Sequence, residues 1–351
     1  MGAPRIVIGG AGVIGAATAW FLAQRGVQVT IVERHEAGGA ASGKSGGFLA
    51  RDWCDGTALE VLARRSFALH QALPTRTGRD WGLRAVDTLA VGRGRRTGRE
   101  PAWLGPEFAA LGVLGDQSTT AQLDPAAFTR GLLDAAMALG ARLVRGSVGG
   151  VLQDGEKITG AIVDGRPLIA DGVVLALGPW SQAVAGRLPL PPVGALAGHS
   201  LLFRPALPLT AQALFVSDGS GDTPELFPRA DGTVYVCGRA TVLPLPDDPA
   251  AVVPDAAAIR ILHALALRLV PALADAPLLA AQACHRPITA DQLPLIGRVP
   301  GLANAYVATG HGPWGILNAP ATGEALAELI LDGATAHVDL GPFDPARRPP
   351  A

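Results

Sequence analysis

Residues 5–33 read RIVIGGAGVIGAATAWFLAQRGVQVTIVE, and this stretch decides the fold. The β-branched run at 6–8 is typical of a buried parallel strand. A helix is expected over 13–25, because Gly26 can end it in the left-handed conformation. A second strand follows over 27–32. The stretch therefore predicts a βαβ unit, the building block of an α/β fold.

The glycines between this strand and helix match the pattern Gly-x-Gly-x-x-Gly. Gly10 permits the turn, Gly12 lets a pyrophosphate approach the backbone, and Gly15 lets the helix pack closely on the strand. The free N–H groups of the helix attract phosphate, and Glu33 can bind a ribose hydroxyl. This order predicts an adenine dinucleotide site without choosing between FAD and NAD. A plain βαβ unit with a glycine-rich turn is the alternative.

Composition narrows the class of protein. The 351 residues carry a formal net charge of −1, so nothing indicates a nucleic-acid or anionic-membrane partner. A hydrophobic share of 49% excludes general disorder. The 45 glycines and 29 prolines follow no Gly-X-Y period, which excludes collagen. The length predicts two domains, which can be interleaved.

The cysteines and histidines predict neither disulfides nor a metal site. Three cysteines lack a Cys-x-x-Cys pair, and the seven histidines lack paired spacing. A reducing, cytoplasmic location is therefore expected. Residues 6–23 form an uncharged run of 18, long enough for a membrane span or a signal sequence. Its four glycines indicate a strand, a turn and a helix instead.

Two further glycine-rich loops stand elsewhere in the chain. Residues 43–47 match Gly-x-Ser-x-Gly, but the strand and helix that a hydrolase nucleophile requires are not predicted beside them. We expect the loop at 38–47 to follow the cofactor, with Ser42 and Lys44 available to the pyrophosphate. Near the end, a strand at 305–308 runs into the third loop, 310–316, whose following helix can stabilise negative charge.

Turn and capping signals divide the rest of the chain into shorter elements. Asn318 is predicted to cap the last helix, with Pro320 in its first turn. Arg76–Arg99, with seven arginines, is expected to be a solvated loop that could also attract an anionic substrate. The other expected elements are helices over 57–73, 125–140 and 255–270, a β-meander over 150–177 whose last strand returns to the parallel sheet, and strands over 199–204 and 233–237 of a second sheet.

Several motifs together resemble a known family. They are the first glycine loop with Glu33, Ala41-Ser42-Gly43, Leu175–Trp180, and Gly310-His311-Gly312 before Pro320–Gly323. In this order, over nearly the whole chain, they resemble the D-amino-acid-oxidase-like (DAO) FAD-dependent oxidoreductases, near the glycine oxidase and sarcosine oxidase branch. The resemblance implies a Rossmann-type, glutathione-reductase-like FAD-binding domain. An interleaved α+β substrate domain, built on an antiparallel sheet, is expected to lie over the flavin.

The resemblance also implies which parts of the chain build each domain. Residues 1–50, 125–190 and 290–351 are expected to form the FAD-binding domain, and residues 51–124 and 191–289 the substrate domain. The residues expected to bind FAD are Gly10, Gly12, Val13, Ile14, Gly15, Glu33, Arg34, Ala41, Ser42, Gly43, Lys44, Gly46, Gly47, Val148, Gly178, Trp180, Gly312, Pro313, Trp314, Gly315 and Ile316.

The activity implied is oxidation of the C–N bond of an amino acid or secondary amine, with hydride transfer to flavin N5. O2 is the expected acceptor, giving H2O2. Two alternatives remain open: an FAD-binding assembly or interaction factor with little turnover, and an NAD-dependent dehydrogenase. The sequence does not fix the substrate or the oligomeric state.

The family's pattern also implies substrate-binding residues. Arg286, in the string 285–291, aligns with the arginine that holds the substrate carboxylate, although a structural pairing with Asp291 is the alternative. His285 and Trp314 are further candidates to bind the substrate.

Two more residues fall at positions where the family suggests a role. His311 is the candidate catalytic residue, although a hydrogen-bonding role in its loop fits it better. Cys284 is a minor candidate for covalent FAD attachment, and non-covalent FAD is expected. The second arginine of the D-amino-acid oxidase motif is replaced by Ile288-Thr289.

Overall fold

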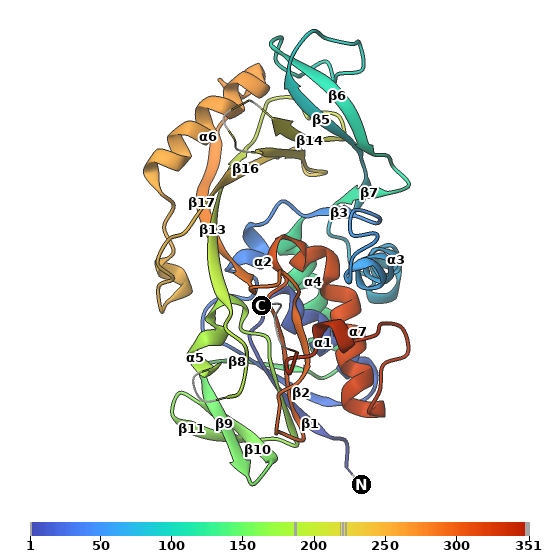
Figure 1. Cartoon of the computed structure of the whole chain (residues 1–351), viewed down its shortest axis with the longest axis vertical. Coiled ribbons are helices and arrows are strands. Elements are labelled where there is room, and N and C mark those ends of the chain that lie inside the picture. The colour runs from blue at the N-terminus through green and yellow to red at the C-terminus, as the bar shows by residue number, and fades with distance from the viewer. Residues whose placement is uncertain (1, 186–187, 218, 220, 222, 348–351) are drawn as a thin grey trace.

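The computed structural model describes residues 2–185, 188–217, 219, 221 and 223–347, and it places two large sheets toward opposite ends of an elongated molecule (Figure 1). The lower sheet has the order β18-β19-β12-β1-β2-β8. Its neighbouring strands are parallel except β18 and β19. The six strands are β1 (Arg5–Gly9), β2 (Gln28–Glu33), β8 (Arg142–Arg145), β12 (Gly172–Leu175), β18 (Leu295–Arg298) and β19 (Ala305–Thr309).

Helices cover one face of this sheet and a small sheet covers the other. Alternation along β1 sends Ile6 and Ile8 into the core beneath the helices, while Val7 joins the core beneath the small sheet. On the helical side, α1 packs between α4 and α7, and α3 packs against α7. These elements are α1 (Val13–Gln24), α3 (Glu60–Thr77), α4 (Pro125–Ala138) and α7 (Gly315–Asp332), with β9 (Val148–Asp154), β10 (Lys157–Val163) and β11 (Arg166–Ile169) in the small sheet.

The upper sheet has the order β17-β13-β16-β15-β14-β5-β6. Its strands pair antiparallel, as expected for the substrate domain, except that β14 and β5 are parallel. Helix α6 (Ala256–Leu269) packs on the outer face against apolar side chains such as Val234 and Val236. The strands are β5 (Asp87–Arg93), β6 (Phe108–Gly115), β13 (Gly194–Phe203), β14 (Gln212–Ser217), β15 (Glu225–Pro228), β16 (Val234–Thr241) and β17 (Leu278–Ile288).

Short elements connect the two halves. A three-stranded sheet, β3-β7-β4, lies between them. The short elements are β3 (Phe48–Ala50), β4 (Arg84–Ala85), β7 (Thr120–Gln122), α2 (Ala41–Lys44), α5 (Gln182–Ala185), and the 3-10 turns Gly178–Ser181, Pro249–Ala251, Pro271–Leu273, Gly312–Trp314 and Gly341–Phe343.

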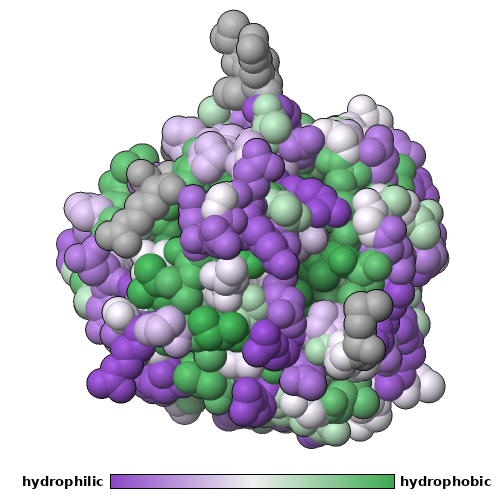
Figure 2. All heavy atoms as spheres, turned by 90° about the horizontal axis from the view of Figure 1, so that it is seen from below, coloured by the Kyte–Doolittle hydropathy of each residue, from purple (hydrophilic) through white to green (hydrophobic). Residues whose placement is uncertain are grey.

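The uncharged run at 6–23 holds β1, a turn and most of α1, as predicted. Within the part of the chain that the structure describes, no helix has the length and apolar character to cross a membrane. Hydrophilic and apolar residues are interspersed on the face of the molecule seen from below (Figure 2).

Predicted elements differ from the structure at Arg76–Arg99 and at the start of α7. The segment Arg76–Arg99 is not one loop, because α3 runs past Pro74 to Thr77 and Asp87–Arg93 forms β5. The strand was hidden because its buried residues, such as Leu89 and Val91, stand among arginines that the neighbouring turns expose.

The second difference is at the start of α7. Asn318 does not cap this helix: α7 begins at Gly315, and Asn318 is a fully buried residue inside its first turns. Pro320 therefore lies within the helix, where it cannot donate to the carbonyl of Ile316.

Helix α3 supplies the hydrogen bonds that this proline disrupts. The Nε2–H of His70 donates to the carbonyls of Ile316 (3.0 Å) and Leu317 (3.1 Å). The displaced amide of Ala321 donates to the Oγ of Ser66 at 3.0 Å. Two buried side chains of α3 thus replace the backbone partners that α7 lacks.

Replacing His70 should destabilise the fold in a pH-dependent way. Burial lowers the pKa of His70 to about 4, so the folded protein holds it neutral. The unfolded chain takes up this proton below about pH 6.5, and the stability due to His70 is lost as pH falls from there toward 4. His70→Ala should cost about 2–4 kcal/mol at pH 7, because buried carbonyls lose their donor.

His70→Gln keeps an N–H donor and cannot titrate. Between pH 7 and 5, its free energy of unfolding in urea should fall by about 2 kcal/mol less than that of the unaltered chain. Equal pH dependence in the two proteins would contradict this account of His70.

Candidate active site

One cavity lies where the two halves meet. Its lining comes from all three glycine-rich loops, from the ends of β2, β9 and β12, and from the inner face of the upper sheet. The carboxyl ends of β1 and β2 open into it, which is where an open parallel sheet binds its ligand.

The first loop owes its shape to Gly10 and Gly15. Gly10 has φ +96°, and a Cβ there would lie 2.4 Å from the carbonyl oxygen of Ala176. A Cβ on Gly15 would lie 1.9 Å from the carbonyl oxygen of Gly10. Only glycine allows both approaches, and they point the N-terminus of α1 into the cavity. Gly12 lines the cavity, as predicted, whereas Gly15 packs behind it.

Glu33 is fixed at the rim of the cavity by backbone amides. Its Oε2 accepts a hydrogen bond from the Ala11 N–H, and its Oε1 from the His35 N–H, both at 2.8 Å. Each carboxylate oxygen keeps a further lone pair for a hydroxyl donor. The residue is therefore held where a ribose could reach it, with Arg34 beside it in the cavity wall.

The second loop contains one helical turn, α2, where the sequence indicates only loop. Ser42 Oγ accepts a hydrogen bond from the Val13 N–H at 2.9 Å, so it caps α1. Lys44 points elsewhere: its Nζ donates to the Ala283 carbonyl at 3.3 Å, and it does not line the cavity. Gly43 packs against Gly38, because a Cβ would lie 2.3 Å from that carbonyl oxygen.

The remaining predicted cofactor residues line the cavity. They come from four segments that are distant in the sequence. They are Gly10, Gly12, Val13, Ile14, Glu33, Arg34, Ala41, Ser42, Gly46, Gly47, Val148, Gly178, Trp180, Gly312, Pro313, Trp314, Gly315 and Ile316.

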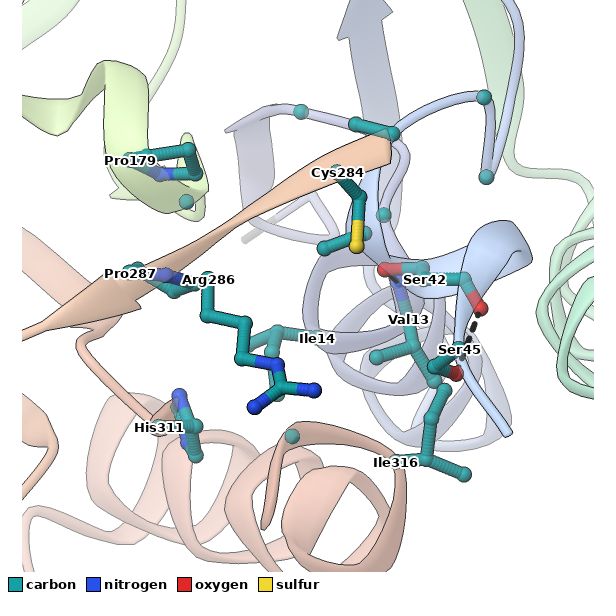
Figure 3. A pocket seen from close by; sticks show the side chains of 18 of the residues that line it. Val13, Ile14, Ser42, Ser45, Pro179, Cys284, Arg286, Pro287, His311 and Ile316 are labelled. Atoms are coloured by element: carbon teal, nitrogen blue, oxygen red, sulfur yellow. Dashed lines mark hydrogen bonds between the residues drawn. The ribbon is translucent and has the colours of Figure 1, made fainter. Parts of the chain in front are cut away.

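Arg286 reaches into the cavity from the upper sheet. Figure 3 shows its guanidinium in the space between His311, Ile14 and Ile316. The side chain crosses Gly198 of β13, where a Cβ would lie 3.4 Å from Nη2. Among the described residues it makes no hydrogen bond or ion pair. Asp291, its possible structural partner, instead pairs with Arg347 at 2.8 Å.

His285 and Cys284 neighbour Arg286 on β17. His285 does not line the cavity, because side chains alternate along a strand and its neighbours face inward. Cys284 does line it, and its Sγ points toward Ser42 and Val13 in Figure 3. Burial raises the pKa of the Cys284 thiol, so the reactive thiolate is disfavoured.

His311 is buried and neutral. Its Nε2 forms a hydrogen bond of 3.1 Å with Thr322 Oγ1, and burial lowers its pKa to about 3. The hydrogen bond joins His311 to Thr322 of α7. Trp314 lies next to it in the cavity wall and meets Trp53 edge-on, with ring centroids 6.4 Å apart.

The inner face of the upper sheet adds residues that sequence reasoning missed. Glu225 and Cys237 stand opposite each other in the β15–β16 ladder, and Phe215 stands opposite Glu225 from β14. Phe227 and Tyr235 continue the same face. Alternation in 234–237, with Val234 and Val236 packed outward, is the one sequence signal for two of them. Glu225 lies in a polar, glycine-rich stretch with no such pattern.

The family of FAD-dependent oxidoreductases described as DAO matches residues 5–329 of the chain. The chain belongs to this family. The glycine oxidase of Pseudomonas aeruginosa is 30% identical over 98% of this chain and 99% of its own length. A putative oxidoreductase of Schizosaccharomyces pombe is 29% identical over 97% of both chains. The crystal structure of glycine oxidase from Geobacillus kaustophilus has a TM-score of 0.84 at 27% identity, and covers 99% of this chain and 100% of that one.

Membership of the DAO family decides for FAD over NAD, and the cavity fits the cofactor. A Cβ on Gly12 would meet only the Ser42 hydroxyl, at 3.1 Å, so the backbone is open to a pyrophosphate. The amides of Ile14 and Gly15 stand in the first turn of α1 and have no acceptor within the helix. The glycine oxidase relatives place the DAO-family chain in that branch.

One group outside the cavity has metal-ligand chemistry. The ligand atoms of Glu324, Glu328 and His337 lie within 4.8 Å of one another. Arg65 already donates to both oxygens of Glu324 at 2.7 Å, and His337 Nδ1 bonds Glu328 at 2.6 Å. These bonds satisfy the cluster without an ion.

The packing of Gly15 predicts a loss of cofactor on substitution. Gly15→Ala should yield protein with little bound flavin and reduced stability, because the methyl group would force α1 away from β1. Gly112→Ala is the matched control, since nothing lies within 4 Å of its added Cβ. The ratio of flavin to protein, from visible absorbance after purification, measures the effect. A normal flavin ratio in Gly15→Ala would contradict the assigned packing.

Proposed function

We propose that the protein oxidises the C–N bond of an amino acid or N-substituted amino acid, with O2 as the electron acceptor. The observation that carries the proposal is Arg286, a partly buried guanidinium with unused donors inside the cavity of an FAD-dependent oxidoreductase. A planar guanidinium binds a carboxylate through two parallel hydrogen bonds. Bound FAD would accept the hydride at N5, which is chemistry that no side chain supplies.

The protein's own residues would hold both partners. We assign the pyrophosphate to the backbone at Gly12 and Ile14 and the ribose to Glu33, in keeping with the predicted cofactor residues that line the cavity. Arg286 would hold the substrate carboxylate above the flavin. Neutral His311 and the Trp314 ring would border the substrate and exclude water. The three free cysteines suit a reducing compartment, and we place the protein in the cytoplasm.

A substrate screen tests this proposal. FAD-loaded protein is mixed anaerobically with amino acids and N-methyl amino acids, and loss of the oxidised flavin spectrum is followed. Admission of O2 should restore the spectrum and release H2O2. A flavoprotein that no amine reduces would overturn the proposal and favour an FAD-binding interaction factor. Reduction without reoxidation by O2 would assign a dehydrogenase instead.

Arg286→Gln should raise KM for a carboxylate substrate by a factor equivalent to about 2–4 kcal/mol, because the charged hydrogen bonds are lost. That is roughly thirtyfold to several hundredfold. Flavin content should stay normal. Arg260→Gln, on the exposed side of α6 outside the upper sheet, removes the same charge at a residue that does not line the cavity and should leave KM unchanged. An unchanged KM in Arg286→Gln would remove the carboxylate role.

A further inference from the structure

The cavity holds a second charge, the half-buried Glu225, that the proposed chemistry leaves unused. It lies on the inner face of the upper sheet, with its backbone between those of Phe215 and Cys237 in the β-ladder. The Cys237 Sγ–H donates to Oε2 at 3.5 Å, which is a weak partner for a carboxylate. No cation forms an ion pair with Glu225 among the described residues. Part of its side chain remains accessible because it opens into the cavity.

A carboxylate in this position is costly unless something compensates it. Burial raises the pKa of Glu225, and the charge of Arg286 partly opposes that rise. Arg286 and Glu225 attract each other along the inner face of the upper sheet, yet they form no ion pair. A structural salt bridge would bring them into contact. Here each keeps hydrogen-bonding capacity for a third partner.

The surface between the two charges is hollow. Strands β17, β13, β16 and β15 lie side by side in that order, and they carry Arg286, Gly198, Cys237 and Glu225 respectively. The two middle residues are small, and the Arg286 side chain already extends over Gly198. All four residues line the cavity, so a ligand held there lies beneath the sheet between the two charged groups.

Aromatic rings enclose the Glu225 end of this hollow. Phe215 and Phe227 lie with ring centroids 5.8 Å apart, and Trp53 meets Phe215 at 4.8 Å. Phe48 stacks on Phe227 at 5.4 Å. Such walls exclude water and strengthen any charge interaction that forms there. The ring faces also suit a cation.

We propose that Glu225 binds the cationic amine of the substrate while Arg286 binds its carboxylate. The inference rests on the proposed function and deepens it. The two groups together recognise a zwitterion, so the site selects α-amino acids and their N-alkyl derivatives over carboxylic acids or amines alone. An acid without an amine would engage Arg286 and leave the Glu225 carboxylate without a cation in contact with it.

Matched ligand pairs test this role. The probes are glycine with acetate, proline with cyclopentanecarboxylate, and phenylalanine with 3-phenylpropionate, each pair differing only in the amine. Binding to the FAD-loaded protein is measured by anaerobic calorimetry with the flavin reduced in advance, so that no turnover occurs. Glu225→Gln keeps the shape and the hydrogen bond from Cys237, and Glu156→Gln, in an exposed turn, is the charge control.

Glu225→Gln should weaken binding of the amino acid about tenfold or more, as loss of a charged hydrogen bond predicts, and leave its amine-free partner within about twofold. Arg286→Gln should weaken both members of a pair, and Glu156→Gln neither. If Glu225→Gln weakens both members alike, it acts only through Arg286 and the proposal is overturned, as it is if neither changes. If the unaltered protein binds no amino acid and none reduces its flavin, the proposed function itself fails, and this inference with it.

Discussion

The contact between the backbones of Gly15 and Gly10 is the constraint on which the rest of the structure depends. It brings the first turn of α1 against the end of β1, so the helix N-terminus opens directly into the cavity. The helix must then run through the core, and residues 13–23 are almost all apolar and buried. Gly323 of α7 extends the same principle, because a Cβ there would lie 2.7 Å from the Ala17 carbonyl carbon. Two helices thus approach each other closely where only glycine fits.

Helix α7 brings a second N-terminus to the same cavity, by a different physical route. Pro320 interrupts its hydrogen bonding within two turns of the helix start at Gly315, which would leave buried carbonyls without donors. His70 and Ser66 of α3 supply those bonds from a segment 250 residues away in the chain. The first turns of α7 can therefore accommodate a proline beside the cavity, while α3 ties them to the core through buried hydrogen bonds.

Features that depend on neighbouring residues could be predicted from the sequence, whereas features that depend on contacts between distant segments could not. Neighbouring residues determine three kinds of local feature, and each appears as predicted. They are the segment from Gly10 to Glu33, the N-caps Asp124 and Asp255, and the turns of the β-meander. Asn318 was assigned as a cap because Pro320 follows it, and no local signal could reveal that His70 makes an interior proline tolerable. Lys44 and His285 were placed at the site by their positions in motifs, but neither lines the cavity. Lys44 instead donates a hydrogen bond to the Ala283 carbonyl, and strand alternation turns His285 outward. Glu225 was missed because only pairing of β15 with β16 brings it to the cavity.

Because few residues of the chain are charged, the presence of two charged side chains in one cavity requires an explanation. Glycine turns and the backbone at the start of α1 line the cavity, and backbone amides can bind an anion without a charged side chain. Arg286 and Glu225 are different, since each is partly removed from water on folding and forms no ion pair among the described residues. A fold with only 17% charged residues would gain stability from apolar groups at both positions. A ligand with a carboxylate and an ammonium group on one carbon would give each of the two side chains an oppositely charged partner.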